Sequence, residues 1–495
     1  MNRRSFLQST SAAVAGALTA SAQQNSALTG LGPQYSGQPA GTHLPDPSPP
    51  AKPNIIWICA DQLRAQALSF NGDPNSRTPC LDRAEVEGVS FTSHVSGFPL
   101  CCPFRGSLFT SRYAHHCVPG HEYPLPKGQE TVADVFNANG YDTAFYGKWH
   151  LGGWHESQGR AAFFITDPDR RGGFKEWTGY ENNNSQWDCW VHGGRDRNTF
   201  HYRLPGYETD ALTDLFISYV KEKGADRKNG KEQPFFAVLS VQPVHDPNIA
   251  PERFMVNYRP ERMQLRDNVA HVPRVLEKAR RELAGYYAEL ENLDWNYGRV
   301  IAALEQADLL HNTHVMFFSD HGDMHGSHGM FRKTNPYEEA IRTPMIISGG
   351  IPSYDAWKKG RIPVLSNSVD IAPTTLGLCG IGKPAWMEGT DYSHYRLATS
   401  PAAPSEPDSA YLEVVVPPGH PDSINTPYRG LVTKDGWKYV CFENTSWLMF
   451  NLNEDPYEEA NLAQNNQFRA QRKKLINRLK QWVADTGDTF QIPSD

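Results

Sequence analysis

The stretch NIIWICADQ, residues 54–62, places the polar pair Asp61-Gln62 directly after a nearly continuous apolar run. Such a run predicts a strand buried on both faces, because a strand with one solvent face would alternate apolar and polar residues. Apolar residues at helical spacing predict helices over residues 212–220 and 283–304. Three more apolar runs of strand length occur along the chain, namely DTAFY (142–146), FFAVLS (235–240) and HVMFFS (314–319). The sequence therefore predicts an α/β fold with a mainly parallel or mixed central sheet flanked by helices.

Polar residues capable of chemistry follow each of the four runs. They are Asp61 and Gln62 after the first, Lys148 and His150 after the second, His245 after the third, and Asp320 and His321 after the fourth. The carboxyl ends of parallel strands meet at one edge of a sheet, where open α/β proteins bind ligands. We therefore expect these side chains to form one site.

The types of residue indicate the ligands of that site. Asp61, Gln62 and Asp320, with His321 beside them, suit a hard divalent cation better than zinc. Cationic and proton-transferring groups accompany them, namely Lys148, His150, His245 and Lys333, and such a set suits a tetrahedral oxyanion, either sulfate or phosphate. His325 and His328, in SDHGDMHGSHG, are expected to be solvated loop residues rather than zinc ligands.

Two adjacent cysteines stand in PLCCPFRGSLFTSRY, residues 99–113. Pro103 suits the first position of a helix, so Cys101 would lie just before a helix N-terminus, where a thiol pKa falls and backbone N–H groups face an anion. A cysteine-thiolate phosphatase would need five residues between cysteine and arginine, and only three separate Cys101 from Arg105. Spacing thus disfavours a thiolate nucleophile, and Cys102 is interpreted as a small, partly buried neighbour.

The pattern Cys101-x-Pro103-x-Arg105 resembles the formylglycine signature of the sulfatase family, in which the cysteine is oxidised to an aldehyde. Further segments resemble the family in the same order: TPCLDRAEVEGVSFT (78–92), YGKWHLG (146–152), SDHGDMHGSHGMFRKTNPYEEAIRTPMII (319–347), SVDIAPTTLGLCGI (368–381) and NEDPYEEANLA (453–463). The resemblance covers residues from about 53 to the end. It implies an alkaline-phosphatase-like fold and hydrolysis of a sulfate ester.

Carried over by position, the resemblance implies that Cys101 becomes formylglycine. It implies a divalent cation, usually calcium with magnesium as the alternative, held by Asp61, Gln62, Cys101, Asp320 and His321. Arg105 and Lys148 would hold the aldehyde hydrate and the sulfate, and His150 would assist breakdown of the intermediate. His245 with Lys333 would bind sulfate and protonate the leaving oxygen.

This chain departs from the usual family pattern at three positions. Phe104 stands where many members have serine or alanine, and Gln62 and His321 stand where Asp and Asn are common. The last two variants are similar to choline-sulfatase-like and phosphonate-hydrolase-like members. A phosphodiester or phosphonate monoester hydrolase is therefore an alternative function, and a catalytically silent glycan-binding protein is another.

Aromatic and cationic residues are dense between residues 149 and 207. The aromatic ones include Trp149, Trp154, Trp177, Tyr180, Trp187, Trp190, Tyr202 and Tyr207, interspersed with six arginines. They would suit an anionic sulfated sugar, and they would equally suit a well-packed insertion. Both interpretations stay open, and a sulfated glycan or a sulfated small molecule is the expected substrate.

Composition excludes other classes of partner. A net charge of −7 and a sequence pI near 6.2 argue against a nucleic-acid-binding surface. The chain contains no run of eighteen apolar residues, so the sequence predicts no membrane span. Eight cysteines in 495 residues are too sparse for a disulfide scaffold.

The N-terminus predicts export. Arg3 and Arg4 precede a weakly apolar segment ending in Ala20-Ser21-Ala22, which is typical of a twin-arginine signal peptide over residues 1–22. A flexible leader (23–52), a catalytic domain (53–385) and a smaller α+β subdomain of antiparallel sheet and helix (386–495) are expected to follow. The protein would be periplasmic or secreted, with the twin-arginine machinery and a formylglycine-generating enzyme as partners before export.

Overall fold

A computed structural model describes residues 52–195, 197–350, 357–398, 405–420 and 422–494. The predicted signal peptide and nearly all of the predicted leader lie outside the described residues. Within them, no helix is both long enough and apolar enough to cross a lipid bilayer.

The central sheet of the described residues has ten strands in the order β10-β2-β9-β8-β1-β7-β3-β4-β5-β6. Its middle four strands, β8, β1, β7 and β3, run parallel to one another. The edges add antiparallel pairs, so the sheet is mixed, as predicted. The strands are β1 (Asn54–Ala60), β2 (Val89–Phe91), β3 (Asp142–Lys148), β4 (Glu176–Tyr180), β5 (Trp190–Gly193), β6 (Phe200–Arg203), β7 (Phe235–Ser240), β8 (Thr313–Ser319), β9 (Met345–Gly349) and β10 (Gly360–Ile362).

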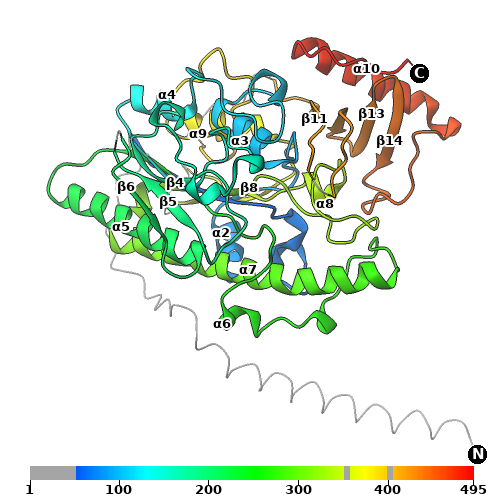
Figure 1. Ribbon diagram of the computed structural model, residues 1–495. Coiled ribbons are helices and arrows are strands. Elements are labelled where there is room, and N and C mark those ends of the chain that lie inside the picture. The colour runs from blue at the N-terminus through cyan, green and yellow to red at the C-terminus, as the bar shows by residue number, and fades with distance from the viewer. Residues whose placement is uncertain (1–51, 196, 351–356, 399–404, 421, 495) are drawn as a thin grey trace, which may run out of the picture. The chain divides into compact units, whose positions relative to one another are not determined.

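Helices cover both faces of this sheet (Figure 1). They are α2 (Pro79–Glu87), α3 (Cys101–Thr110), α4 (Val132–Ala138), α5 (Glu208–Lys228), α6 (Glu252–Met255), α7 (Pro273–Gln306), α8 (Glu338–Ile341), α9 (Ile371–Leu378) and α10 (Arg469–Asp485). Ile56 and Ile58 of β1 face the core shared with α2, α5 and α7, whereas Ile55 and Trp57 face the core shared with α3, α4 and α9. This alternation explains why the middle strands are apolar on both faces.

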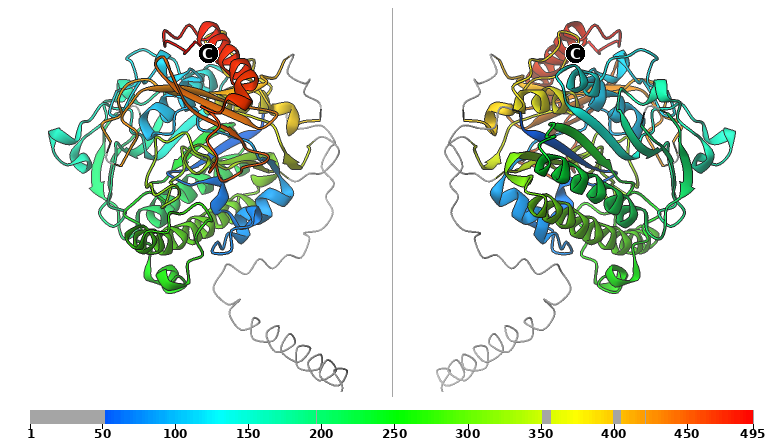
Figure 2. Two further views of the ribbon diagram at one scale, coloured as in Figure 1. Left: turned by 90° about the vertical axis from the view of Figure 1, so that its right-hand side faces the viewer. Right: turned by 90° about the vertical axis from the view of Figure 1, so that its left-hand side faces the viewer.

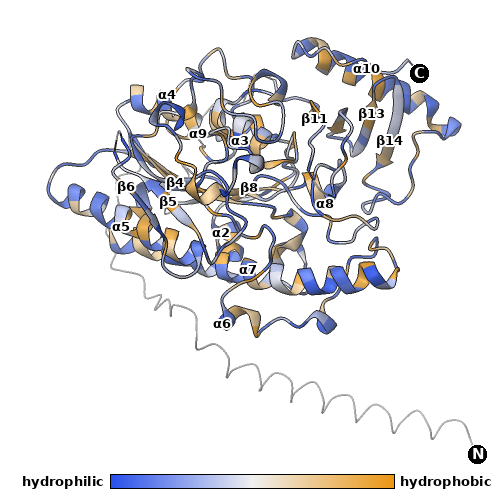
Figure 3. Ribbon diagram, in the orientation of Figure 1, coloured by the Kyte–Doolittle hydropathy of each residue, from blue (hydrophilic) through white to orange (hydrophobic). Residues whose placement is uncertain are grey.

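Local sequence signals set the helices in place. Proline occupies the first helical position of α2 and α7, where a missing N–H leaves no hydrogen bond unmade. Thr131 and Asp134 form a capping box at the start of α4. α5 and α7 carry both hydrophilic and hydrophobic residues (Figure 3), as expected for helices with one face on the sheet.

A second, antiparallel sheet follows late in the chain. Its strands are β11 (Ser409–Val414), β12 (Tyr428–Thr433), β13 (Trp437–Phe442) and β14 (Thr445–Asn451), in sequential order. Helix α10 packs on it through Leu475, Leu479 and Trp482 (Figure 2). The predicted smaller α+β unit is therefore present, while its boundary at residue 386 stays a prediction.

Candidate active site

The four parallel strands deliver the predicted polar residues to one edge of the sheet. Asp61 and Gln62 directly follow β1, and Lys148 is the last residue of β3. His245 lies in the turn after β7, and Asp320 directly follows β8. Asp61 and Lys148 are fully buried, with their carboxylate and ammonium groups 2.7 Å apart. Residues 87 positions apart in the sequence thus form one ion pair because their strands end together.

Close contact between β3 and β7 shapes this edge. Gly147 has a φ of +106°, and a Cβ there would lie 1.9 Å from the carbonyl oxygen of Ser240, so only glycine fits. The adjacent Arg105 guanidinium donates through Nη1 to the Lys148 carbonyl oxygen and to Ser240 Oγ, both at 2.8 Å. The two strands therefore fix the guanidinium in place.

Two of the predicted site residues have unusual backbones. Gln62 has a φ of +65° and His150 a φ of +58°, in the left-handed region that non-glycine residues seldom occupy. Such conformations cost on the order of 1–3 kcal/mol each and cluster at functional sites.

Cys101 lies at the centre of this group. Its thiol is 3.2 Å from His321 Nε2 and 3.6 Å from Asp61 Oδ1. Two ammonium groups also lie within 4 Å of Sγ, Lys333 at 3.6 Å and Lys148 at 3.9 Å. A side chain at position 101 thus meets a carboxylate, an imidazole and two cations at once, in a place where Cys101 is only 2% exposed.

Helix α3 begins earlier than the sequence indicated. Cys101 is its first residue and Leu100 its N-cap, whereas we expected Pro103 to open the helix. Pro103 is still tolerated, because the first four N–H groups of a helix have no intrahelical partner. The first internal hydrogen bond runs from Phe104 N to Leu100 O at 3.0 Å.

A divalent cation fits the oxygen-rich side of the site. One ligand atom from each of Asp61, Cys101, Asp320 and His321 lies within 4.8 Å of the other three. Asp320 Oδ2 is buried and makes no hydrogen bond within the described residues, although Arg105 Nη2 is 3.8 Å away. A buried carboxylate oxygen without a hydrogen bond is costly, and a bound cation would satisfy it.

Gln62 lies beside this cluster, and its side-chain amide makes hydrogen bonds to neighbouring side chains. Its side-chain oxygen accepts a hydrogen bond from Lys333 at 2.9 Å, and its Nε2 donates to Asp323 at 2.7 Å. A carbonyl oxygen accepts two bonds, so Gln62 can hold Lys333 and a cation together.

Charges around Cys101 set the protonation of the site. Burial alone would raise the pKa of Asp61, but Lys148 and its neighbouring cations hold it well below its usual range. Burial opposes the charged form of His321, yet Asp320 raises the pKa of that imidazole above its ordinary value. The centre thus keeps its carboxylate ionised among cations, which is an environment prepared for an anion.

Lys333 and His245 form a tight pair. The Lys333 ammonium donates to His245 Nε2 at 2.7 Å, and His245 Nδ1 lies 2.7 Å from the Asp246 carbonyl oxygen. Burial, with Lys333 beside it, lowers the pKa of His245 to about 3. His245 is therefore neutral at ordinary pH.

His150 is also neutral, because burial and the nearby Lys148 hold its pKa well below the ordinary value. Neither of its ring nitrogens makes a hydrogen bond to any described residue. A buried imidazole without a partner is rare and available for a ligand or a proton.

Sequence reasoning missed several residues of this centre. Asp323 and Asp246 both accept from Gln62 Nε2, and Ser240 binds Arg105. Asp323 follows Asp320 at a short spacing and could have been found from that signal. Asp246 and Ser240 flank predicted positions but carry no pattern of their own.

The expectation for the two loop histidines was wrong for His325. It is only 1% exposed, packs edge-on against Tyr286 at 4.5 Å between ring centroids, and is not solvated. His328 is half-buried and stacks on Tyr337 at 4.1 Å. The chain folds this loop inward, so His325 lies buried beside Asp323, whereas His328 keeps part of its surface in water.

The aromatic insertion is mostly core. The buried members are Trp149, Trp154, Trp177, Tyr180 and Tyr207. Trp187 and Tyr202 are 43% and 38% exposed. Packing therefore accounts for most of this aromatic density, and three rings are exposed, those of Trp187, Tyr202 and Phe163.

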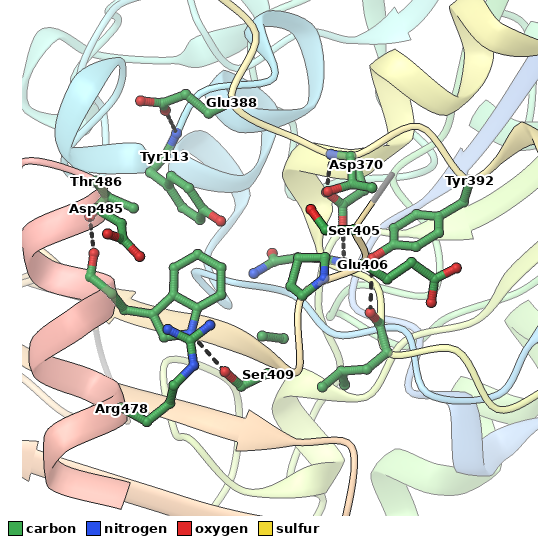
Figure 4. A pocket seen from close by; sticks show the side chains of 16 residues that line it. Tyr113, Asp370, Glu388, Tyr392, Ser405, Glu406, Ser409, Arg478, Asp485 and Thr486 are labelled. Carbon is green, nitrogen blue, oxygen red and sulfur yellow. Dashed lines mark hydrogen bonds between the residues drawn. The ribbon is translucent and has the colours of Figure 1, made fainter. Parts of the chain in front are cut away.

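A separate pocket of about 450 Å³ lies beside α10 (Figure 4). The described residues that line it include Tyr113, Asp370, Glu388 and Arg478, and none of the predicted site residues. Its carboxylates already have donors: Asp370 accepts from the backbone of Thr390 at 2.7 Å, and Glu388 from that of Tyr113 at 2.6 Å. The convergence at Cys101, not this pocket, carries the chemistry.

Comparison with known proteins gives the family. Residues 53–381 match the family described as Sulfatase, and residues 326–485 match N-sulphoglucosamine sulphohydrolase, C-terminal. The chain is similar to an ulvan-active sulfatase of Formosa agariphila, at 33% identity over 89% of this chain and 83% of that protein. It is also similar to an N-acetylglucosamine-6-O-sulfatase of Bacteroides thetaiotaomicron, at 25% identity over 87% and 86% of the two chains.

The fold agrees with this relationship. The crystal structure of yidJ from Bacteroides fragilis superposes with a TM-score of 0.77 and 26% identity, over 90% of this chain and 98% of that one. The fold, the matched segments and the residues of the site all support the same assignment. The chain belongs to the sulfatase family of alkaline-phosphatase-like fold and is a sulfuric ester hydrolase.

Proposed function

We propose that this hydrolase removes sulfate from a sulfated carbohydrate, with formylglycine at position 101 and a divalent cation, calcium by preference. The burial of Cys101 against Asp61, His321, Lys148 and Lys333 is the observation that carries the proposal. The similar proteins named for ulvan and for N-acetylglucosamine 6-O-sulfate support a carbohydrate substrate.

Asp61, Gln62, Asp320 and His321, with residue 101, would hold the cation. Three oxygen donors and one imidazole suit a hard ion such as Ca²⁺, with Mg²⁺ as the alternative. When bound, the cation would supply positive charge against the sulfate oxygens and the nucleophile.

Formylglycine would supply a hydrated aldehyde as the nucleophile in place of a thiol. The residues around it have separate tasks. Arg105 and Lys148 are fixed and cationic, so they bind and orient the sulfate. Neutral His150 has two unpartnered nitrogens and can accept a proton from a hydroxyl at position 101.

The Lys333–His245 pair faces the departing alcohol in this proposal. Lys333 Nζ lies 2.7 Å from His245 Nε2, so we propose that this pair supplies the proton to the leaving oxygen. Such general acid catalysis contributes typically ~10²–10⁴-fold.

Mass spectrometry tests the modification. Trypsin releases Ala84–Arg105, which contains both cysteines. From a host that converts such cysteines, we expect replacement of the thiol and one hydrogen by an aldehyde oxygen at Cys101, with Cys102 still alkylatable in the same peptide. An unmodified Cys101 from that host would refute the proposed nucleophile.

A substrate panel tests the reaction. Sulfated mono- and oligosaccharides, an aryl sulfate and an aryl phosphate diester are compared with a Cys101→Ala variant as the blank. We expect the highest kcat/KM on a sulfated sugar. Preference for the diester would instead favour a phosphodiester or phosphonate ester hydrolase, and binding without turnover would favour a glycan-binding protein.

We also propose export by the twin-arginine route, supported by Arg3 and Arg4 ahead of the apolar segment. An R3K/R4K double variant is expected to stay in the cytoplasm, whereas the unaltered chain reaches the periplasm or medium. Cell fractionation measures this, and unchanged export of the variant would contradict it. Conversion of Cys101 would precede export, because this route carries folded proteins.

A further inference from the structure

Cys102 faces a different group of side chains from Cys101. It is the second residue of α3 and has no exposed surface. Its Sγ lies 4.0 Å from His121 Nδ1 and accepts a hydrogen bond from the backbone N–H of Glu122 at 3.3 Å. The rings of His121 and His150 meet edge to face, with centroids 5.7 Å apart. One ligand atom from each of Cys102, His121 and His150 lies within 4.8 Å of the other two.

His150 is the member of this trio whose ring nitrogens both lack a hydrogen bond within the described residues. It is 2% exposed, and both ring nitrogens are buried without a hydrogen bond to a described residue. Its left-handed backbone, at φ +58°, holds the ring in this position at some cost in strain. A buried polar ring that is held in place and left unsatisfied indicates a ligand that meets it there.

A thiolate and two imidazoles are the ligands that zinc prefers, unlike the oxygen-rich set around Cys101. Tetrahedral zinc has Zn–S near 2.3 Å and Zn–N near 2.0–2.1 Å, which places neighbouring ligand atoms about 3.3–3.6 Å apart. The 4.0 Å between Cys102 Sγ and His121 Nδ1 is close to that separation. Small rotations of the Cys102 and His121 side chains would bring these two atoms to that separation.

The outer side of His121 supports the same chemistry. Glu122 Oε1 lies 3.9 Å from His121 Nε2, and a carboxylate behind a metal-binding imidazole is a common supporting arrangement. The His121 side chain is 17% exposed, so an ion can enter there and keep a water as its fourth ligand. Lys148 and Lys333 interact electrostatically with His121, so they would also repel a cation and weaken the site.

We propose that Cys102, His121 and His150 form a second metal site, which takes Zn²⁺ or another thiophilic divalent cation. The Cys102 thiol loses its proton to solvent as the metal–sulfur bond forms. Because His150 also serves the proposed hydrolysis, zinc at this site removes it from the reaction and inhibits the enzyme reversibly. The inhibition rests on the proposed function, whereas the metal binding does not.

Cobalt binding tests the site without any activity. The full chain carrying Cys101→Ser, which removes the neighbouring thiol, is titrated with Co²⁺. We expect a thiolate-to-cobalt charge-transfer band with intense tetrahedral d–d bands, both abolished by excess Zn²⁺. Adding Cys102→Ala or His121→Asn should abolish them. Adding Cys379→Ala, another buried cysteine, should not.

The absence of the band at millimolar Co²⁺, or its persistence without Cys102, would overturn the proposal. Circular dichroism confirms folding of each variant. His121→Asn keeps the test decisive if Cys102→Ala fails to fold, because His121 is partly exposed.

Inhibition is measured on the converted enzyme in excess Ca²⁺. Zn²⁺ should inhibit, a zinc-selective chelator should restore activity, and Cys102→Ala should raise the half-inhibitory Zn²⁺ concentration at least about tenfold. An unchanged value in Cys102→Ala would mean that zinc acts at the Asp61 cluster and would overturn the inhibitory role. If the chain hydrolyses no sulfate ester, the cobalt result still decides whether the site exists.

Discussion

Cys101 and Cys102 are consecutive residues on the first turn of one helix, and their surroundings differ completely. The thiol of Cys101 lies within 4 Å of Asp61, His321, Lys148 and Lys333. Within the described residues, the thiol of Cys102 contacts the imidazole of His121 and the backbone N–H of Glu122, with the neutral imidazole of His150 nearby. A step of about 100° around the helix axis is enough to move a side chain from a charged centre to a nearly neutral one.

The difference shows how position, rather than residue type, selects the reactive cysteine. Residues carried to the sheet edge by four parallel strands surround position 101. Position 102 faces the loop that carries His121, which no strand directs. The charged side suits an anionic substrate and a hard cation, and the neutral side suits a soft metal.

The largest expected contrast is between removal of the two side chains. Cys101→Ala should lower kcat/KM for a sulfate ester by at least about 10³-fold, because the nucleophile is lost. Cys102→Ala should leave it within about twofold in zinc-free buffer, since the Cys102 thiol bonds only His121 and the Glu122 N–H within the described residues and makes no hydrogen bond to His150. Steady-state kinetics on both variants measures the contrast. Equal losses would mean that Cys102 also takes part in hydrolysis.

The central strands and their polar ends were predictable for one physical reason. A strand buried on both faces must be apolar throughout, so β1, β3, β7 and β8 stand out in the sequence, and parallel strands bring their ends together. Strand β12 does not stand out in this way, because Arg429 and Gly430 interrupt its apolar character. Edge strands such as β6, largely exposed, give no continuous run either.

The Cys102 side could not be predicted in the same way. His121 lies 19 residues beyond Cys102 in a loop without periodicity, so only the folded chain shows that they meet. His325 was misjudged for a related reason. A glycine-rich, polar loop usually faces water, but tertiary contacts with Tyr286 bury this one.

The next contrast concerns buried and exposed charge. Lys148→Met leaves the fully buried carboxylate of Asp61 with Arg105 at 3.3 Å as its closest cation. Loss of one partner of a buried ion pair costs about 3–5 kcal/mol of unfolding free energy, and urea denaturation measures it. Lys127→Met is the matched control, because Lys127 pairs with Asp169 at 2.7 Å on the surface and should change stability little. Similar losses in both variants would contradict the structural role given to the Cys101 centre.

Removal of the hard cation should affect only the Cys101 side. EGTA should abolish activity and lower the melting temperature. Ca²⁺ at 100 times its Kd should restore about 2.7 kcal/mol of unfolding free energy. Asp320→Asn should remove this calcium-dependent stabilisation, while Cys102→Ala should retain it. Differential scanning fluorimetry with and without Ca²⁺ measures both. Calcium-dependent stabilisation that persists in Asp320→Asn would place the ion elsewhere.

The smallest effect is expected for alkylation of Cys102 in the folded chain. Burial, with Cys101 beside it, raises the pKa of Cys102 well above its ordinary value, and the thiolate is the reactive form. In the Cys101→Ser chain, iodoacetamide should therefore leave Cys102 unmodified at neutral pH until urea unfolds the protein, as followed by peptide mass spectrometry. Rapid labelling of the native chain would mean that the loop carrying His121 opens readily. The neutral environment would then be only one of several conformations at this position, and the contrast between the two cysteines would hold for the closed loop alone.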